Sequence, residues 1–186
     1  MTAGRKIVAG LFISLDGVVE APEKWSMPYS SGETTESLMR LFEDADTALL
    51  GRSTYQLWST FFPHATSEQV PTAGWMNAAP KYVVSSTLTE AGDWQGSHLI
   101  TGDDVAGQIR ALKQRPGGNI NVGGSITLVQ WLMSNGLLDH LYLQIAPVIA
   151  GTGRTLANGE EIPLRLEATR AFANGVIEAH YVPRSR

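Results

Sequence analysis

The sequence predicts a single α/β domain in which helices cover the faces of a central mixed β-sheet. Short apolar, β-branched runs alternate with segments of helical periodicity, which is the pattern of a layered α/β domain. The 186 residues suit one domain of ordinary size, and they contain no linker and no internal repeat. Near the end, two β-rich runs meet at Asn174-Gly175, which predicts an antiparallel hairpin. We therefore expect residues 1–186 to form one domain.

The first predicted strand covers residues 6–14 and is nearly continuously apolar, as expected for a strand buried on both faces. With Arg5 before it, the run resembles the start of a signal peptide. However, Pro22 would obstruct the best cleavage site, and the run is far too short to span a bilayer. A buried strand is the preferred interpretation. The later predicted strands are residues 47–50, 81–85, 97–100, 120–122, 138–149, 164–172 and 176–182.

Segments between these strands have helical patterns. The first helix begins near Glu33 and places Leu38, Leu41 and Phe42 on one face. The other predicted helices begin at residue 51, lie within 101–114 after an aspartate near the N-cap, and cover 125–134 before an Asn-Gly pair. The remaining segments are a Pro/Ser/Gly loop at 21–32 and an irregular stretch at 58–80 with a turn of helix around 72–79.

Composition excludes several classes of site. The formal net charge of −4 and the absence of a basic stripe argue against a nucleic-acid-binding surface. The lack of cysteine excludes disulfides, thiol catalysis and cysteine-based metal sites, and it is compatible with a cytoplasmic protein. The four histidines show no metal-binding spacing, so we expect no metal site. No membrane partner is expected either.

Three of the predicted strands end in glycine or hydroxyl residues. In an open α/β sheet, ligands bind outside the carboxyl ends of the strands, where the first helical turn has unpaired N–H groups and a partial positive charge. Glycine lets an anion approach this backbone, hydroxyls add hydrogen bonds, and Arg52 can bind a phosphate bidentately. The strand-end residues of this kind are Gly51, Arg52, Ser53, Thr54, Ser85, Ser86, Gly123, Gly124, Ser125 and Thr127.

Each strand end also has a purely structural interpretation. Glycine at a strand-to-helix junction is usually turn chemistry, and serine or threonine there is usually an N-cap. The sequence has no P-loop and no complete G-x-G-x-x-G, and GTGRTL at 151–156 lacks the third glycine. If a dinucleotide binds, an architecture other than the Rossmann fold must hold it.

The motifs FISLDG, LLGRSTYQLW, YVVSS, NVGGSITLVQWL and LYLQIAPVIAGTGRTL occur in an order and spacing that resemble the dihydrofolate-reductase-like superfamily. The similarity is closest to the C-terminal reductase domain of bifunctional riboflavin-biosynthesis enzymes and its stand-alone relatives, and it covers residues 5 to 182. It implies a three-layer fold whose central mixed sheet holds NADPH in an extended pose. It also implies a homodimer, since relatives often pair at the strand corresponding to 138–145.

The resemblance assigns a part of NADPH to each strand end. The cofactor phosphates would meet Gly51, Arg52, Ser53 and Thr54 at a helix N-terminus. The adenosine ribose and its 2′-phosphate would lie near Ser85 and Ser86. The pyrophosphate and nicotinamide would pack against Gly123, Gly124, Ser125 and Ile126, with Thr127 beside them. In relatives the Gly-Gly peptide is often cis.

The substrate side is less well marked. We expect its wall to include Asp16 at the end of the first strand, the following loop with Trp25 and Tyr29, and Glu36 on the first helix. Asp16 would hydrogen-bond a substrate or order its loop, and its alternative is an Asp-Gly turn. Trp25 offers a flat surface to a ring or packs within the loop. Glu36 and its neighbour Glu33 are equally explained as helix N-terminal carboxylates.

The sequence thus predicts an NADPH-dependent reductase of a pteridine- or pyrimidine-like heterocycle, which includes a 5-amino-6-(5-phosphoribosylamino)uracil reductase of riboflavin biosynthesis. Val18 replaces the lysine usual in the riboflavin-pathway enzymes, and Asp139-His140 replaces their Asp-Glu, so neither position favours that substrate. We expect His140 to be a packed or interface residue. Two alternatives stay open: a nucleotide-binding module without turnover, and a dimeric structural protein with an empty cleft.

Overall fold

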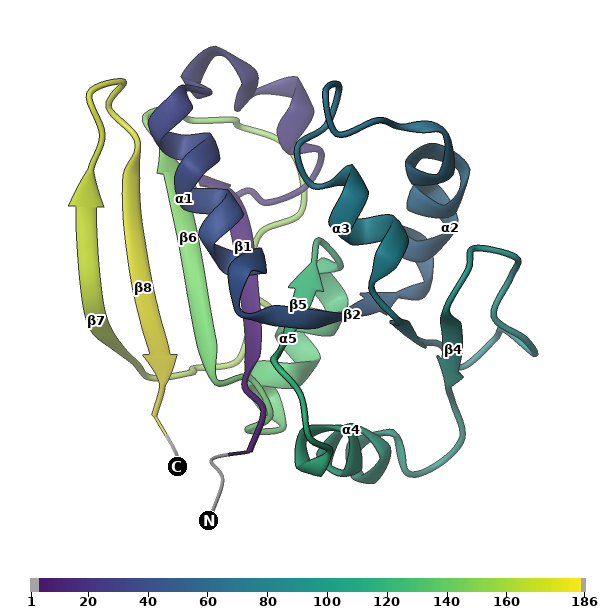
Figure 1. The fold of residues 1–186 in the computed structure, drawn as a ribbon. Coiled ribbons are helices and arrows are strands. Elements are labelled where there is room, and N and C mark those ends of the chain that lie inside the picture. The colour runs from purple at the N-terminus through teal and green to yellow at the C-terminus, as the bar shows by residue number, and fades with distance from the viewer. Residues whose placement is uncertain (1–3, 185–186) are drawn as a thin grey trace.

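The computed structural model describes residues 4–184, which form one eight-stranded sheet in the order β4-β3-β2-β5-β1-β6-β8-β7 (Figure 1). Neighbours from β4 to β6 are parallel, and β8 and β7 add an antiparallel hairpin at one edge. The strands are β1 (Ile7–Ser14), β2 (Ala45–Gly51), β3 (Lys81–Val84), β4 (Ser97–Ile100), β5 (Asn119–Gly123), β6 (His140–Ala146), β7 (Leu164–Ala171) and β8 (Ile177–Pro183).

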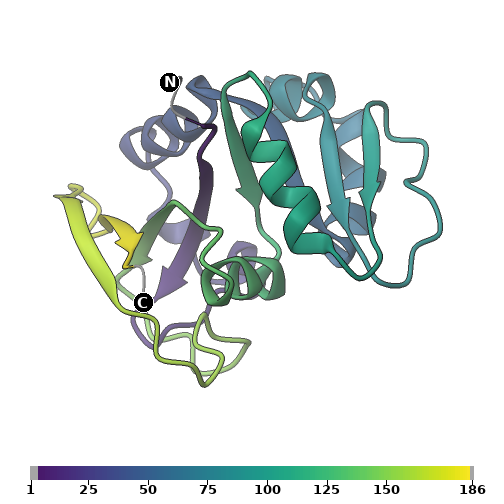
Figure 2. The same ribbon diagram turned by 90° about the horizontal axis from the view of Figure 1, so that it is seen from below.

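Helices pack on both faces of the sheet. The α-helices are α1 (Gly32–Glu43), α2 (Arg52–Phe61), α3 (Ala73–Ala78), α4 (Val105–Gln114) and α5 (Ile126–Ser134). Three short 3₁₀ turns, η1 (Pro22–Lys24), η2 (Met27–Tyr29) and η3 (Phe62–His64), complete the described elements. The first three α-helices lie on one face and α4 and α5 on the other, as Figures 1 and 2 show together. This is the predicted mixed sheet between two helical layers.

The side chains of β2 show how the sheet separates two cores. Leu49 faces the core that contains Ile109 of α4 and Val129 of α5. Its neighbours Ala48 and Leu50 face the other core, which is built on α2 and α3. Because successive side chains of a strand point to opposite faces, a fully apolar strand serves both cores. This explains the nearly continuous apolar runs of the parallel strands.

Helix α1 begins with a capping box and packs closely against β1. The Ser31 Oγ accepts a hydrogen bond from the Thr34 amide at 3.3 Å, and the Thr34 Oγ1 accepts one from the Ser31 amide at 2.8 Å. A side chain at Gly10 would collide with Leu41. The predicted apolar face is therefore against the sheet, but the residues that become fully buried are Thr34 and Ser37.

Two predicted boundaries were wrong. The sequence predicted a strand over residues 138–149 interrupted by Pro147, whereas β6 begins later, at His140, and ends at Ala146, directly before that proline. The amide of Leu138 bonds instead to the Leu132 carbonyl at 3.3 Å, and Pro147 has no N–H for a ladder. Residues 58–80 are also more regular than predicted, because α2 continues to Phe61 and leads into η3 and α3.

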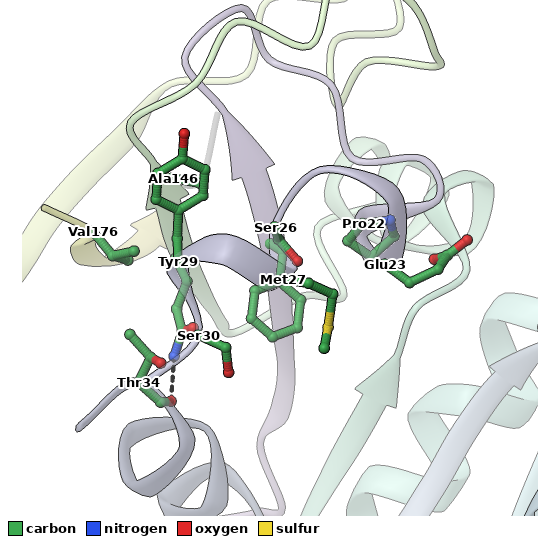
Figure 3. A pocket seen from close by; sticks show the side chains of 11 residues that line it. Pro22, Glu23, Ser26, Met27, Tyr29, Ser30, Thr34, Ala146 and Val176 are labelled. Carbon is green, nitrogen blue, oxygen red and sulfur yellow. Dashed lines mark hydrogen bonds between the residues drawn. The ribbon is translucent and has the colours of Figure 1, made fainter. Parts of the chain in front are cut away.

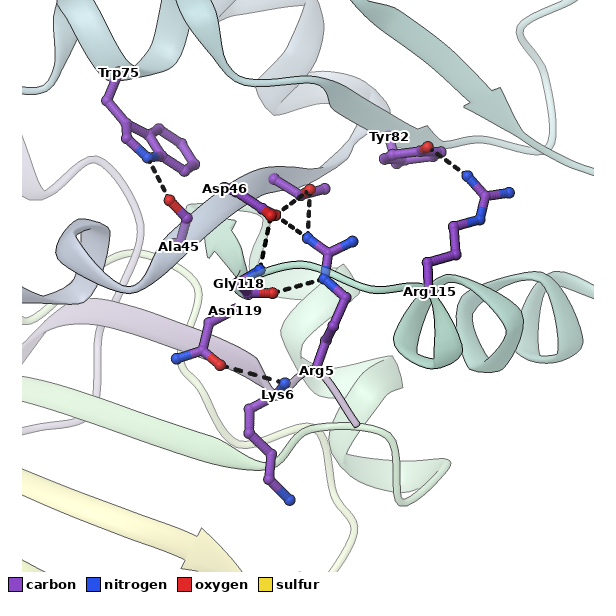
Figure 4. A network of polar contacts seen from close by, with 10 residues as sticks. Arg5, Lys6, Ala45, Asp46, Trp75, Tyr82, Arg115, Gly118 and Asn119 are labelled. Atoms are coloured by element: carbon purple, nitrogen blue, oxygen red, sulfur yellow. Dashed lines mark hydrogen bonds and ion pairs between the residues drawn. The ribbon is translucent and has the colours of Figure 1, made fainter. Parts of the chain in front are cut away.

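A buried arginine ties the amino-terminal edge of the sheet together (Figure 4). The Arg5 Nε donates to the Gly118 carbonyl at 2.6 Å, and its guanidinium also bonds Thr47 Oγ1 at 2.6 Å and pairs with Asp46. The Asp46 carboxylate in turn accepts a hydrogen bond from the Gly118 amide at 2.7 Å. These bonds hold together the amino-terminal ends of β1, β2 and β5, which lie opposite the carboxyl ends where a ligand is expected.

A second buried cation lies at the start of β3. Lys81 is fully buried, its Nζ donates to the carbonyls of Asn77 at 3.1 Å and Gln95 at 2.9 Å, and it lies 4.6 Å from the centre of a Trp94 ring. Burial lowers its pKa to about 8. His140 is packed as expected, with its Nδ1 at 2.9 Å from Nε2 of His180.

Within residues 4–184, no helix is long and apolar enough to cross a membrane. The same part of the chain contains no group of three or more histidine or acidic residues arranged to hold a metal ion. All of its peptide bonds are trans, including the one between Gly123 and Gly124.

Candidate cofactor and substrate site

The three predicted strand ends lie side by side at one edge of the sheet. Strand β2 is between β3 and β5, and all three are parallel, so their carboxyl ends point the same way. Gly51 is in register with Val84, directly before Ser85, and Leu49 is in register with Val122, directly before Gly123. We call residues 51–54, 85–86 and 123–127 the strand-end surface. The structure brings the predicted residues together as a contiguous set.

One hydroxyl joins two of these strand ends. The Ser125 Oγ accepts a hydrogen bond from the Gly51 amide at 2.8 Å and lies 2.7 Å from the Thr54 Oγ1. Ser125 reaches this position in the left-handed region, with a φ of 59°, which is uncommon for a residue other than glycine. The helices α2 and α5 therefore begin next to each other, and the bridge fixes their relative position.

Close packing explains two of the glycines. A Cβ at Gly51 would lie 3.0 Å from the Ser125 Oγ, and one at Gly123 would lie 2.5 Å from Cζ3 of Trp58. Gly124 has a φ of 54°, which favours glycine in any case. Glycine is thus required here by the approach of two turns, whether or not a ligand binds above them.

The helix starts themselves are suited to an anion. Neither α2 nor α5 has a side-chain cap on its first amides. Uncapped N-terminal amides carry a partial positive charge and lack acceptors within the helix. Arg52, Ser53 and Thr127 are exposed on these first turns. Among residues 4–184, no hydrogen bond or ion pair engages the Arg52 guanidinium, whereas Arg5 and Arg170 are both paired with carboxylates.

The remaining members differ in exposure. Ile126 is buried, and Thr54 is half-buried. The Ser85 Oγ is buried and accepts hydrogen bonds from the amides of Thr87 at 3.1 Å and Leu88 at 3.0 Å, so it closes its own turn. Ser86 is exposed beside it. Of the two serines, Ser86 therefore has the hydroxyl that a ligand at this strand end can reach.

The Asp16 carboxylate binds the protein's own loops. Its carboxylate accepts hydrogen bonds from the Ser14 hydroxyl at 2.5 Å, the Ala150 amide at 3.0 Å and the Gly151 amide at 2.8 Å. These three donors, the hydroxyl foremost, lower the pKa of Asp16 to about 2. The geometry matches the loop-ordering alternative, because the carboxylate joins the end of β1 to the loop after β6.

The other two substrate-side candidates also have protein partners. The Trp25 Nε1 donates to the Glu20 carbonyl at 3.0 Å. Glu36 pairs with Arg40 at 2.7 Å, and its neighbour Glu33 pairs with Arg170 at 3.0 Å. The nearest cavity is lined by other residues, so the structure brings none of the three candidates into its wall.

That cavity, which we call the ring cavity, has a volume of about 210 Å³ and lies where β1 and β6 end beneath the start of α1 (Figure 3). The η1 and η2 turns form its other side. Most of the wall is apolar, aromatic or hydroxyl-bearing. The lining residues are Phe12, Pro22, Glu23, Ser26, Met27, Tyr29, Ser30, Thr34, Gln144, Ala146 and Val176.

Sequence reasoning predicted this set in part, because the expected loop with Tyr29 does line the cavity, but it missed the residues of β1, β6 and Val176. The one local signal was Gln144, a polar residue in the middle of an apolar strand. Gln144 is buried, is in register with Phe12, and its Nε2 donates to the Thr34 carbonyl at 2.8 Å. It therefore connects β6, β1 and the first turn of α1 at the cavity wall.

The ring cavity and the strand-end surface lie on the same edge of the sheet. Strand β1 separates β5 from β6, with Gly10 in register with Gly123 on one side and Phe12 with Gln144 on the other. The two regions therefore flank the carboxyl end of β1. A crevice outside the carboxyl ends of parallel strands is the usual ligand position in open α/β sheets.

Comparison with known proteins agrees with this architecture. The protein YyaP of Bacillus subtilis (strain 168), itself described as uncharacterised, is 28% identical over 184 residues, which cover 95% of this chain and 94% of YyaP. The structure of a putative riboflavin biosynthesis protein from Shewanella sp. PV-4 superposes with a TM-score of 0.73 at 18% identity and covers 97% of this chain and 99% of the other.

A third similar structure is dihydrofolate reductase from Enterococcus faecalis in complex with NADP(H), with a TM-score of 0.65, 14% identity and 97% coverage of both chains. At these identities the structural likenesses establish the fold, which is dihydrofolate-reductase-like as predicted. The model of the family described as RibD C-terminal domain matches residues 5–177. With nearly the whole described chain matched, this protein belongs to the RibD C-terminal domain family.

Proposed function

We propose that this protein is an NADPH-dependent reductase that acts on a pteridine- or pyrimidine-like heterocycle. The observation that carries the proposal is the pairing of an anion-suited surface with a ring-sized cavity at one edge of the sheet. The two uncapped helix starts and the unpaired Arg52 suit a dinucleotide phosphate. The ring cavity suits a planar compound beside it.

Similar proteins of known class support a reductase. One similar structure is the riboflavin biosynthesis reductase Rib7 of Saccharomyces cerevisiae, and the dihydrofolate reductase named above was solved with NADP(H). For the present chain, oxidoreductase chemistry is the general expectation for its family. The specific cofactor and substrate are what the proposal adds.

When bound, NADPH supplies a hydride to an electron-poor carbon of the heterocycle. The protein's contribution is mainly to hold two rings in contact and to exclude water. Arg52 and the first amides of α2 would bind phosphate. Ser125 would keep the two helix starts at a fixed separation through its contacts with Gly51 and Thr54. Phe12 and Tyr29 provide the flat apolar walls on the substrate side.

Two titrations test the proposal. Calorimetry with NADPH and with NADH measures binding, and loss of nicotinamide absorbance with pterins, flavin precursors and uracils measures turnover. We expect submillimolar binding of NADPH, weaker binding of NADH, and consumption with at least one ring compound. No NADPH affinity below the millimolar range would contradict the proposal. Binding without consumption across the panel would favour the nucleotide-binding module instead.

We also propose a homodimer. The apolar residues of β6 that suggested pairing are already used in the core, since Leu141 and Leu143 are buried. The large apolar residues exposed on the hairpin are Leu166 and Ile177, which are 50% and 43% exposed. Pairing through the β7–β8 hairpin is therefore the form we expect. Light scattering after size exclusion would measure the mass, and a monomer at micromolar concentration would contradict this proposal.

A further inference from the structure

We infer that the ring cavity accepts an uncharged, unphosphorylated planar heterocycle. This inference rests on the proposed function and narrows its substrate class. A nucleotide-like substrate brings a dianionic phosphate, which needs cationic side chains or free helix amides to replace its water. A base-like substrate needs only apolar walls and a few neutral hydrogen-bonding groups. The wall of the ring cavity consists mainly of apolar residues and neutral hydrogen-bonding groups, as a base-like substrate requires.

No lysine or arginine lines the ring cavity among residues 4–184. The polar groups of the wall are the hydroxyls of Ser26, Ser30, Thr34 and Tyr29, and the amide of Gln144. In the part of the chain that the structure describes, the single charged lining residue is Glu23, which is an anion. In Figure 3 its carboxylate extends away from the side of the cavity formed by Tyr29 and Thr34. A phosphate in this wall would meet hydroxyls and a carboxylate but no countercharge.

The arginines around the cavity are already neutralised. Arg154 binds Glu20 through its Nε at 2.8 Å, and the Glu20 carboxylate also accepts the Arg154 amide at 3.1 Å. Arg170 binds Glu33 at the start of α1 at 3.0 Å. A phosphate that recruited either arginine would have to break an existing ion pair and leave a carboxylate unpaired. Lys24 is the lysine of η1, is exposed, and does not line the cavity.

The start of α1 is a poorer anion site than the starts of α2 and α5. Its Thr34 amide is capped by Ser31, and the Thr34 carbonyl accepts the Gln144 Nε2. This helix start therefore differs from those of α2 and α5, which have no side-chain cap. Uncapped helix amides that can bind an anion are therefore found at the strand-end surface. At the ring cavity, the Thr34 amide of the first turn is already bonded to Ser31.

The size of the cavity agrees with a ring compound. Its volume is about 210 Å³. A cavity of about 150 Å³ holds benzene, and sites for drug-sized ligands are roughly 300–1,000 Å³. A one- or two-ring heterocycle fits this interval, whereas the ribose and phosphate of a nucleotide would have to extend beyond the cavity. Because the Gln144 nitrogen already donates to Thr34, its carbonyl oxygen is the acceptor that can receive a ring N–H.

A cavity with cationic lining exists elsewhere in the molecule. It has a volume of about 370 Å³, and its wall includes the cations Lys6 and Arg184 together with Asp139. It lies at the amino-terminal ends of β1 and β6, whereas the ring cavity lies at their carboxyl ends. Strand β1 has eight residues, which at about 3.3 Å each place the two ends roughly 26 Å apart. The cationic cavity therefore cannot hold the phosphate of a ligand in the ring cavity.

Matched pairs of ligands test the inference. The pairs are 6-hydroxymethylpterin with its phosphate monoester, and uridine with uridine monophosphate. Calorimetry without cofactor measures their binding, and inhibition or support of NADPH consumption measures their effect on turnover. We expect at least tenfold tighter binding of the neutral member in each pair that binds. Equal or tighter binding of the phosphate ester, or binding of no member, overturns the inference.

Adding a positive charge to the cavity wall tests whether this wall causes the preference for neutral ligands. We expect Ser26→Lys to narrow the ratio between neutral and phosphorylated ligand at least fivefold, because it adds a cation to the wall. Ser30→Lys is the second variant in case the first does not fold. Thr60→Lys adds the same charge to an exposed position of α2 and should leave the ratio unchanged. An unchanged ratio in both folded wall variants would overturn the assignment to the ring cavity.

The two proposals fail in different ways. NADPH binding is measured separately, so loss of the cofactor result removes the reductase proposal. The cofactor-free ligand ratio still decides whether the cavity prefers neutral rings. Conversely, NADPH-dependent turnover of the phosphate ester alone keeps the reductase and overturns the neutral-ring inference.

Discussion

The strand-end surface and the ring cavity lie at the carboxyl ends of parallel strands in the same sheet, but they differ in how they are assembled and in their charge. The strand-end surface consists of successive residues at strand-to-helix turns, and its charge is positive through Arg52 and the helix starts. The ring cavity is assembled from β1, β6, α1 and the η1 and η2 turns, and its wall is neutral apart from Glu23. A dinucleotide and an uncharged ring therefore find separate, chemically distinct places. The variants below test that division.

The largest expected effect is the loss of NADPH affinity when the positive charge of Arg52 is removed from the strand-end surface. Arg52→Ala should weaken NADPH binding by about 1.5–3 kcal/mol, the usual contribution of a charged hydrogen-bonding group. Binding of a neutral ring in the ring cavity should not change. Calorimetry measures both. Arg110→Ala is the control, because Arg110 is another exposed arginine, on α4. Equal NADPH affinities in wild type and Arg52→Ala would show that the phosphate lies elsewhere.

The next effect concerns packing beneath that surface. Gly123→Ala places a Cβ 2.5 Å from Cζ3 of Trp58 and should lower the free energy of unfolding by about 1–3 kcal/mol. Urea denaturation measures the change. Gly32→Ala is the matched control, since a Cβ there meets nothing within 4 Å. Adding Trp58→Leu to Gly123→Ala should restore part of the loss, and purely additive losses would contradict the contact.

A smaller effect is expected at the bridging hydroxyl. Ser125→Ala removes the acceptor of the Gly51 amide and the contact with Thr54, and it should cost about 0.5–1.5 kcal/mol of stability per hydrogen bond lost. Ser125→Gly loses the same bonds but adopts the left-handed backbone freely. It should therefore be more stable than Ser125→Ala in thermal unfolding. The reverse order would show that the backbone conformation is not the cost we assign to it.

The smallest effect separates loop order from ligand binding. Asp16→Asn should destabilise the protein at neutral pH, because three donors stabilise the ionised carboxylate. Its folded-state pKa of about 2 lies below the ordinary value of 3.8. The stability it provides is therefore complete above the ordinary pKa and is lost as pH falls towards 2. Wild-type and variant unfolding curves should converge over that interval, and a constant difference would contradict the role.

The strand-end surface could be predicted because its signals are local. Gly51, Ser85 and Gly123 each follow a short apolar run and precede a turn or helix, so the type of junction is written in neighbouring residues. Parallel pairing of β2, β3 and β5 then places those junctions together. The sequence alone could not show whether the glycines at these junctions are required for close packing or for ligand binding. The glycines satisfy both, as the contacts of Gly51 with Ser125 show.

The ring cavity could be predicted only in part, because most of its wall depends on register. Phe12, Thr34, Gln144 and Val176 are far apart in the chain, and only the pairing of β1 with β6 places two of them on one face. The loop that carries Tyr29 was chosen correctly, but the other candidates lie outside the wall. Glu36 illustrates the difficulty, because an i, i+4 partner at Arg40 engages its carboxylate. A charge in sequence does not reveal which side of a helix faces the ligand.

Lys81 gives the protein a built-in reporter of local opening. Its amine is enclosed between Asn77, Gln95 and Trp94, whereas Lys6 and Lys24 are exposed. An acylating reagent should therefore modify the exposed amines at once and Lys81 only when α3 and the start of β3 separate. The rate of that single modification measures how often this half of the domain opens. A ligand on the strand-end surface, at the other end of β3, would be detected as slower labelling at Lys81 if it suppresses this opening.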